Sequence, residues 1–367
     1  MATRLLCLVL LLRSAATAQE KDGLDSGRRL SLTPTFQSTS IWTERGVLQP
    51  FTRDHPWSLA LDAGWLSNSQ RAWNSCGCYT QSGLSLGYFN FANPAKLGHA
   101  VTLSAFTAPY LRVSKRMIVS LRGSAGLAFL DRVYDSVRNR ENIFFSTPMS
   151  FYLALGLAAD YRLSSKWSLY GAAQFNHISN GGRRDPNEGM NFPGWGVGVR
   201  YTAKGEGLTP RVTAPFTDRG WTIIAQLFGN QRTVQATPSL PMEQRPLVGL
   251  NVGMVRRLGR INSIGPGGEW YFDGINAAIQ QRGGPVLSPG TAAVNLQHYL
   301  YLGKLLFGQQ VAWFVTSNTG YTRRFFQQYV LQYEVSRGWY AGVLLKAHGD
   351  HSDFLAFALG RSFMVRR

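Results

Sequence analysis

The chain has 367 residues, a net charge of +18, 39 glycines and 13% aromatic residues. After its first residues no stretch reaches the 18 or more apolar residues that a spanning helix needs, which excludes helical membrane spans. Near-neutral mean hydropathy instead suits strands with one apolar and one polar face. The positive charge suits a phosphate-rich partner, either nucleic acid or anionic lipid.

Residues 1–18 predict a signal peptide for export. Arg4 precedes a short apolar run over residues 5–12, and Ala-Thr-Ala at 16–18 is typical of a cleavage site. The signal contains two arginines and no acidic residue, so the mature chain keeps +16 of the +18 charge. Export favours lipid as the partner, and we expect no nucleic-acid partner.

Residues 19–55 are polar and predict a loosely ordered leader or a first strand. From residue 56 onward, short alternating segments recur between turn residues, which is typical of a membrane barrel. We expect strands near 57–66, 81–91, 98–109, 116–129, 148–161, 165–179, 192–203, 219–231, 246–256, 267–280, 294–305, 309–321, 325–335, 338–347 and 353–363.

The pattern therefore predicts an all-β fold, an antiparallel transmembrane β-barrel of about 14–16 strands in the cell outer membrane of a Gram-negative type of cell. In 355–363 large apolar residues alternate with small ones, and the small ones suit a barrel interior. The glycine- and proline-containing stretch 204–218 is a long loop or a boundary between residues 56–203 and 219–367. Whether 219–367 closes the same barrel or forms a second one stays open.

The segment from Trp167 to Asn191 carries the candidate chemistry. Its odd positions are apolar from Trp167 to Phe175 and would face lipid, and His177 and Ser179 continue that face. Asn191 has the same parity on the following strand, so a hairpin would place it beside His177. Three polar side chains then converge at one end of the lipid-facing surface.

These residue types suit ester hydrolysis. Ser179 needs a neighbouring base to remove its proton, and His177 lies two residues away on the same face. Asn191 would accept a hydrogen bond from the histidine and fix its tautomer, as the acid of a Ser-His-Asp triad does. Backbone amides around Asn180, Gly181 and Gly182 would stabilise the oxyanion.

The sequence gives less specific predictions for two arginines that follow the serine and for two cysteines elsewhere in the chain. Arg183 and Arg184 either contact lipid phosphates or lie on a solvated loop. Cys76 and Cys78 form a disulfide or bind metal weakly, and we expect no functional role for them. The sequence has no four-ligand metal spacing, so we expect neither a metal nor another cofactor.

The run His177-x-Ser179-Asn180-Gly181, with Asp185-Pro186 and Asn191 after it, resembles the His-Ser-Asn site of outer-membrane phospholipase A over about 20 residues. That resemblance would imply calcium assistance and a homodimer. The alternative function is thus a phospholipase A, and a further alternative is a non-enzymatic structural or pore barrel with a vestigial site.

The same run, together with Pro186-Asn187-x-Gly189, is also similar to lipid A 3-O-deacylases, the acyloxyacyl-hydrolase-like family (PagL-like). This second likeness extends to residues 81–109 and to the C-terminal sequence KAHGDHSDFLAFALG. It implies an outer-membrane hydrolase that cleaves an ester-linked acyl chain of lipid A or lipopolysaccharide. In that family the third site residue is a glutamate, whereas this chain has Asn191, so Glu188 and Asp185 are candidate substitute acids.

Overall fold

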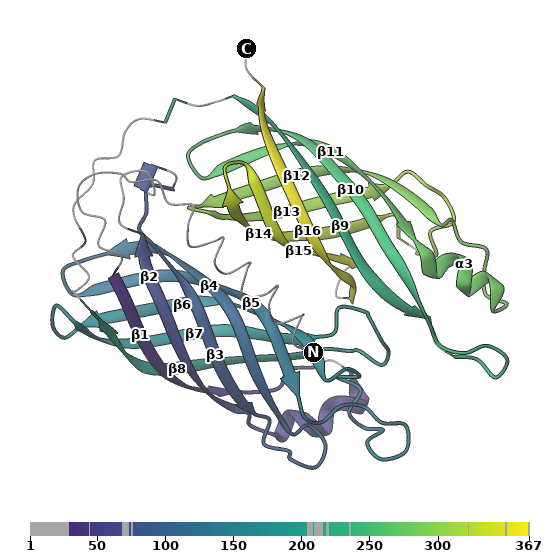
Figure 1. Cartoon of the computed structure of the whole chain (residues 1–367), viewed down its shortest axis with the longest axis horizontal. Coiled ribbons are helices and arrows are strands. Elements are labelled where there is room, and N and C mark those ends of the chain that lie inside the picture. The colour runs from purple at the N-terminus through teal and green to yellow at the C-terminus, as the bar shows by residue number, and fades with distance from the viewer. Residues whose placement is uncertain are drawn as a thin grey trace, which may run out of the picture.

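The computed structural model describes residues 29–43, 45–67, 73–74, 76–203, 208, 216–217, 220–234, 236–321, 323–348 and 351–365, without the side chain of His351. These residues form sixteen strands in two closed antiparallel barrels of eight strands each (Figure 1). No helix within the described ranges is long and apolar enough to cross a membrane. The predicted signal peptide, 1–18, lies outside these ranges.

The first barrel contains β1 (Arg29–Thr39), β2 (Trp57–Ser67), β3 (Thr80–Asn90), β4 (His99–Val113), β5 (Met117–Leu130), β6 (Met149–Arg162), β7 (Trp167–Ser179) and β8 (Met190–Thr202). A 3-10 helix, η1 (Gly46–Arg53), follows β1. The second barrel contains β9 (Trp221–Val234), β10 (Glu243–Arg257), β11 (Asn262–Asp273), β12 (Gly290–Leu302), β13 (Leu305–Phe314), β14 (Phe325–Ser336), β15 (Trp339–His348) and β16 (His351–Val365), with α3 (Gly274–Gln281) after β11. The predicted boundary, 204–218, falls between β8 and β9.

Strand β1 lies within residues 19–55, for which we expected a leader or a first strand, and it belongs to the first barrel. Leu32 of β1 pairs with Ala63 of β2 and also with Tyr201 of β8, so β1 closes the first barrel. Its side chains alternate as a barrel requires, because Leu32 is exposed and its neighbours Ser31 and Thr33 are buried. Residues 19–55 therefore supply a first strand, which brings the total among the described residues to sixteen.

Helix α3 corrects the predicted strand at 267–280. Strand β11 ends at Asp273, whose carboxylate accepts a hydrogen bond from the backbone N–H of Ile275 at 3.2 Å. This is the usual cap of a helix N-terminus. Ile275 and Ile279 are four residues apart, so they share one face of the helix.

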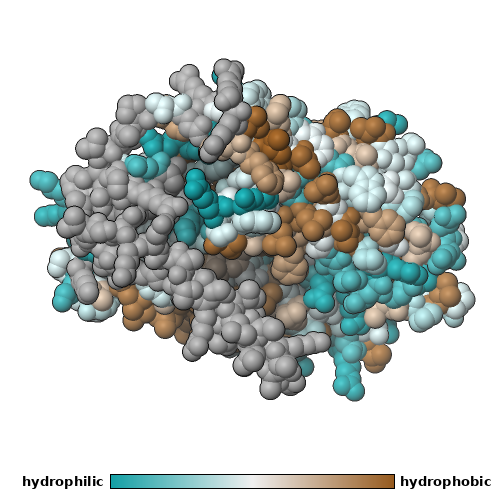
Figure 2. Space-filling view, turned by 45° about the horizontal axis from the view of Figure 1, so that its top comes forward, coloured by the Kyte–Doolittle hydropathy of each residue, from teal (hydrophilic) through white to brown (hydrophobic). Residues whose placement is uncertain are grey.

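The barrel walls have apolar outer faces and largely polar interiors. In β16, Phe357 and Leu359 are 61% and 59% exposed, whereas Ala356 and Ala358 are buried, as the alternation predicts. Figure 2 shows brown apolar side chains spread over the outer surface between polar ones. Inside the first barrel, two buried ion pairs join Arg122 to Asp62 at 3.0 Å and Arg200 to Asp160 at 2.8 Å.

An aromatic cluster closes the first barrel at one end. Phe91, Phe144, Phe145 and Phe192 are fully buried there, and the ring of Phe91 contacts those of Phe145 and Phe192. Two of these phenylalanines come from the connection 131–148 between β5 and β6. This packing gives the ends of β7 and β8 a rigid support.

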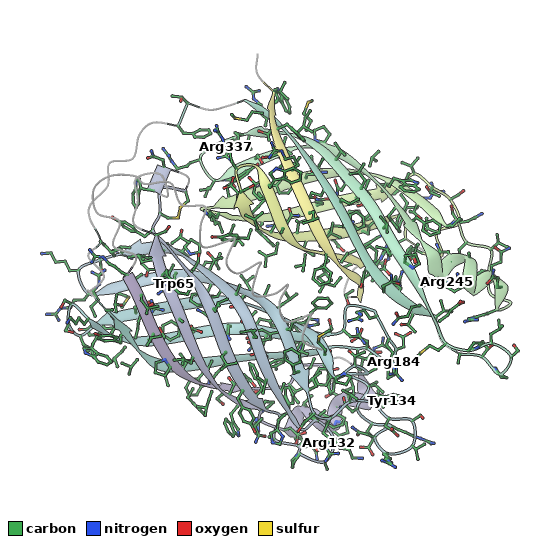
Figure 3. All side chains as sticks on the ribbon, in the orientation of Figure 1. Trp65, Arg132, Tyr134, Arg184, Arg245 and Arg337 are labelled. Carbon is green, nitrogen blue, oxygen red and sulfur yellow. A yellow bond between two sulfur atoms is a disulfide. The ribbon has the colours of Figure 1, made fainter. Side chains whose placement is uncertain are left out.

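The two barrels lie side by side with corresponding ends together. At one end, the backbone N–H of Leu355 in β16 donates to the carbonyl oxygen of Gly181 in the β7–β8 connection. At the other end, Arg260 donates to the carbonyl oxygen of Asn74 at 2.6 Å. Figure 3 shows Arg184 and Arg245 near the first end and Trp65 and Arg337 near the opposite one. The two barrels can therefore share one membrane orientation.

Candidate active site

His177 and Asn191 face each other across the β7–β8 hairpin. They are register partners, and His177 Nδ1 lies 2.7 Å from Asn191 Oδ1. A carbonyl oxygen only accepts hydrogen bonds, so Nδ1 carries the proton and donates it to Asn191. The other ring nitrogen, Nε2, is then unprotonated in the neutral ring and can act as a base.

Ser179 is the last residue of β7 and shares the outward parity of His177. Along this outward row Phe175 is 37% exposed, His177 is half-buried and Ser179 is only 8% exposed. Ser179 lines a cavity together with residues of the second barrel, among them Phe354 and Leu355. The expected lipid-facing row thus runs into a site enclosed by protein.

Gly189 packs directly against the histidine and the serine. Its φ is +69°, a region that favours glycine. A methyl group built on Gly189 would lie 2.9 Å from His177 Cε1 and 3.1 Å from Ser179 Cβ. Any larger residue would therefore displace both side chains. In the sequence, Gly189 was noticed only as part of the motif Pro186-Asn187-x-Gly189, and its contact with His177 and Ser179 was not predicted.

Asn180 organises the connection between β7 and β8. Its backbone N–H donates to Asn187 Oδ1 at 2.9 Å, and its side-chain Nδ2 donates to Ser146 Oγ and to the carbonyl oxygen of Arg184. All its donors are therefore engaged within the protein, so this geometry gives no support to the oxyanion role expected for Asn180, which stays a prediction. Asn180 instead holds the shape of this loop. The alternation of residues along β7 could not indicate this role.

Gly181 and Gly182 are the remaining oxyanion candidates. Their φ angles are +70° and +78°, consecutive values that a larger residue adopts only with strain. Among the residues the structure describes, neither backbone N–H has a hydrogen-bond acceptor. Both glycines line the same cavity as Ser179.

The predicted substitute acids do not contact His177. Glu188 forms an ion pair with Arg45, with 3.0 Å between Oε2 and Nε, and its backbone N–H donates to the carbonyl oxygen of Ile143. Asp185 lines the cavity beside Ser179. The residue at the histidine is Asn191, so the structure gives the orienting contact to a neutral amide.

The two arginines of the loop have different surroundings. Arg183 is half-buried, its backbone N–H donates to Asn180 Oδ1, and its carbonyl oxygen accepts a hydrogen bond from Thr233 of the second barrel. Arg184 is exposed at the end of the barrel, as Figure 3 shows. Arg184 is therefore the more accessible of the two side chains.

Ser179 opens into a cavity of about 280 Å³ between the two barrels. The first barrel contributes Ser179 and the β7–β8 connection. The second barrel contributes the end of β9, helix α3 and the start of β16. The contribution of the second barrel was not predicted, because no local pattern in the sequence indicates it.

No metal-binding cluster forms in the part of the chain that the structure describes, where no three His, Cys, Asp or Glu side chains group together. Cys76 and Cys78 form a disulfide in the β2–β3 connection. This connection lies at the end of the first barrel opposite to Ser179, so the disulfide is remote from the candidate site.

Two family models match the chain, one on each barrel. The model described as lipid A 3-O-deacylase (PagL) matches residues 57–200, and the model described as acyloxyacyl hydrolase, C-terminal domain (PagL_C), matches residues 221–366. The chain belongs to the PagL-like family. It is accordingly an acyl ester hydrolase of the lipid A deacylase class, and family membership decides against a purely structural or pore function.

No curated protein matches the chain. Among solved structures, a chain described as "Asymmetric conductivity of engineered proteins" is 13% identical, with a TM-score of 0.21, and covers 91% of this chain and 99% of its own. A triple mutant of the Rhodopseudomonas blastica porin is 11% identical, with a TM-score of 0.20 and the same coverage. TM-scores this low indicate neither a shared fold nor a shared function between these structures and the PagL-like chain.

Proposed function

We propose that this deacylase is a serine hydrolase that cleaves an ester-linked acyl chain of lipid A in the outer membrane. His177 Nε2 removes the proton of Ser179 Oγ, and the oxygen attacks the ester carbonyl carbon. The tetrahedral intermediate collapses, the sugar hydroxyl leaves with the proton from His177, and an acyl-serine remains. Water, activated by the same histidine, then releases the fatty acid and restores Ser179.

The hydrogen bond from His177 Nδ1 to Asn191 is the observation that carries this proposal. It fixes the tautomer that leaves Nε2 free to accept the serine proton. Asn191 supplies no negative charge, so it orients the ring but stabilises the imidazolium less than an aspartate would. Gly181 and Gly182 N–H groups are proposed to stabilise the oxyanion, as preorganised backbone donors do in other hydrolases.

Loop length supports a site on the exterior side of the membrane. Bacterial barrels have short periplasmic turns and longer extracellular loops. The connections 131–148 and 274–289 lie at the Ser179 end, whereas 303–304 and 337–338 lie at the other. We therefore place Ser179 at the outer leaflet, where lipid A resides in Gram-negative cells, with Arg184 towards its phosphates.

Phospholipase A activity is a second candidate because the residue that contacts His177 is an asparagine. The His177–Asn191 contact reproduces the His-Ser-Asn arrangement on which the phospholipase resemblance rests. The alternative differs in the head group of the lipid, and it would imply calcium and a homodimer.

A direct comparison of lipids separates the two candidates. The purified chain is incubated with lipid A and with phospholipid vesicles, each with calcium or with a chelator, and the products are identified by mass spectrometry. We expect loss of one acyl chain from lipid A, unaffected by chelation. Calcium-dependent fatty acid release from phospholipid alone would support the phospholipase and overturn the lipid A assignment.

A further inference from the structure

We infer that the cavity between the barrels binds the acyl chain of the ester that Ser179 attacks, and that the second barrel supplies the apolar wall of this site. The inference rests on the proposed function because it assigns a substrate subsite to the same serine. The ligand class is a long-chain fatty acyl group, or the fatty acid that hydrolysis releases.

The two barrels fit together at an opening in the wall of the second one. The ladder between β9 and β16 runs only from Trp221–Val365 to Gly229–Phe357, although β9 continues to Val234 beside β10. The Gly181 carbonyl oxygen occupies this opening, where it accepts hydrogen bonds from Asn230 Nδ2 at 3.0 Å and from Leu355 N–H at 3.4 Å. The second barrel is thus fixed against the loop that carries the oxyanion candidates.

Apolar side chains of the second barrel form one side of the cavity. Ile275 and Ile279 are half-buried on one face of α3, and Leu345, Phe354 and Leu355 come from β15 and β16. Its volume of about 280 Å³ is close to the lower limit of ordinary ligand sites, roughly 300 Å³. An apolar wall beside a nucleophile suits the hydrocarbon part of an ester, since burial of methylene groups away from water is favourable.

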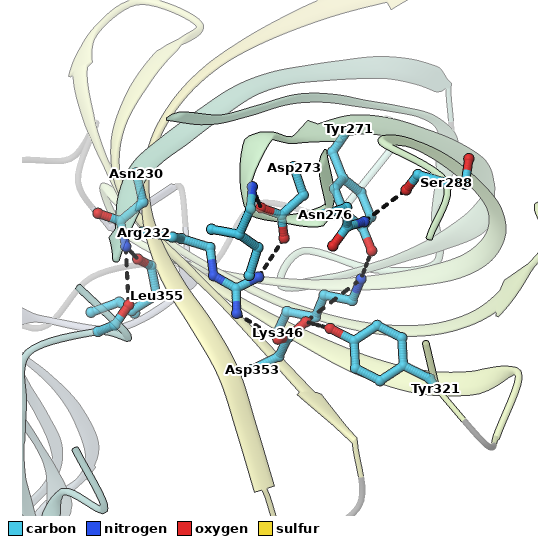
Figure 4. Close-up of polar contacts among 12 residues, drawn as sticks. Asn230, Arg232, Tyr271, Asp273, Asn276, Ser288, Tyr321, Lys346, Asp353 and Leu355 are labelled. Atoms are coloured by element: carbon cyan, nitrogen blue, oxygen red, sulfur yellow. Dashed lines mark hydrogen bonds and ion pairs between the residues drawn. The ribbon is translucent and has the colours of Figure 1, made fainter. Parts of the chain in front are cut away.

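The charged side chains that the second barrel contributes to the lining are paired with one another, as Figure 4 shows. Arg232 lines the cavity and forms ion pairs with Asp273 and Asp353. Asp353 also accepts a hydrogen bond from Tyr321 and lies 4.0 Å from Lys346 Nζ. Because Arg232 is shared by two carboxylates, the cavity offers no excess positive charge for a phosphate. The lining therefore disfavours a phosphate-bearing head group, and the apolar side chains on its second-barrel side are available to contact the acyl chain.

Photo-crosslinking tests this assignment without turnover. The full chain carrying Ser179→Ala is irradiated in detergent micelles with palmitate that bears a diazirine near its terminal carbon, and labelled peptides are identified by mass spectrometry. We expect labels in 274–281 and 352–355 that unlabelled palmitate removes. An added Ile279→Trp substitution fills the cavity and should reduce these labels about tenfold, since losing a few methylene contacts has effects of this size.

Ala277→Trp is the matched control because Ala277 is exposed and lies two positions from Ile279 on the same helix. It adds the same bulk outside the cavity, and labelling should stay at the parent level. Labels confined to the outer belt of the barrels, or full labelling in the Ile279→Trp protein, would overturn the inference. Either result would leave the proposed reaction intact, because that reaction is tested separately by product analysis.

Discussion

Replacing Ser179 with alanine is expected to lower the rate of fatty acid release from lipid A by about 10³-fold or more. Removing the nucleophile of a Ser-His hydrolase abolishes the covalent route, and single losses of this kind have effects up to about 10⁶-fold. The side chain of Ser179 is small and lines the cavity rather than the main core, so the barrels should fold normally. The measurement is the initial rate of fatty acid release, followed by mass spectrometry.

Ser168→Ala provides the control for this substitution. Ser168 lies on the same strand and is buried like Ser179, but its parity places it on the interior face of the first barrel. Its activity should remain within about twofold of the parent, the range of an uncoupled site. A Ser179→Ala protein that deacylates lipid A at the parent rate would contradict the assignment of the nucleophile.

Replacing His177 with alanine should lower the rate by a similar factor, about 10³-fold, because Ser179 then lacks a base. Asn191→Ala should cost less, about ten- to a hundredfold, since the amide orients the ring without supplying charge. Combining the two should cost no more than His177→Ala alone, because Asn191 acts through the histidine. Asn191→Asp should retain activity or increase it.

A second histidine–asparagine contact, between His298 and Asn262 in the second barrel, provides the control for the His177 substitution. His298 of β12 lies 3.3 Å from the side-chain oxygen of Asn262, with Nε2 as the contacting atom, and it is remote from Ser179. His298→Ala should keep the parent rate. Equal losses in His298→Ala and His177→Ala would mean that general destabilisation of the barrels, rather than loss of the base, explains the effect.

The geometry of the hairpin that carries the candidate site was predictable because it depends on local alternation. Period-2 parity alone placed His177 and Asn191 on one face, and the structure has them as register partners. One other prediction failed for a local reason. The strand expected at 267–280 ends early because a capped helix, α3, directly continues the apolar strand β11.

The enclosure of the site could not be predicted from the sequence. Leu355 has outward parity and would be exposed on an isolated barrel, yet it is only 3% exposed because the β7–β8 connection covers it. The contact from Asn230 to Gly181 joins residues of different barrels. Such contacts depend on how two finished barrels meet, and neither hydrophobic period nor turn chemistry specifies that.

Covalent labelling of Ser179 tests the central claim most directly. The folded chain is treated with a fluorophosphonate, digested and examined by tandem mass spectrometry. The account predicts a single adduct on Ser179, formed at least about a hundredfold more slowly in the His177→Ala protein because the serine then lacks its base. An adduct on another serine, or equal labelling of Ser179 with and without His177, would contradict it.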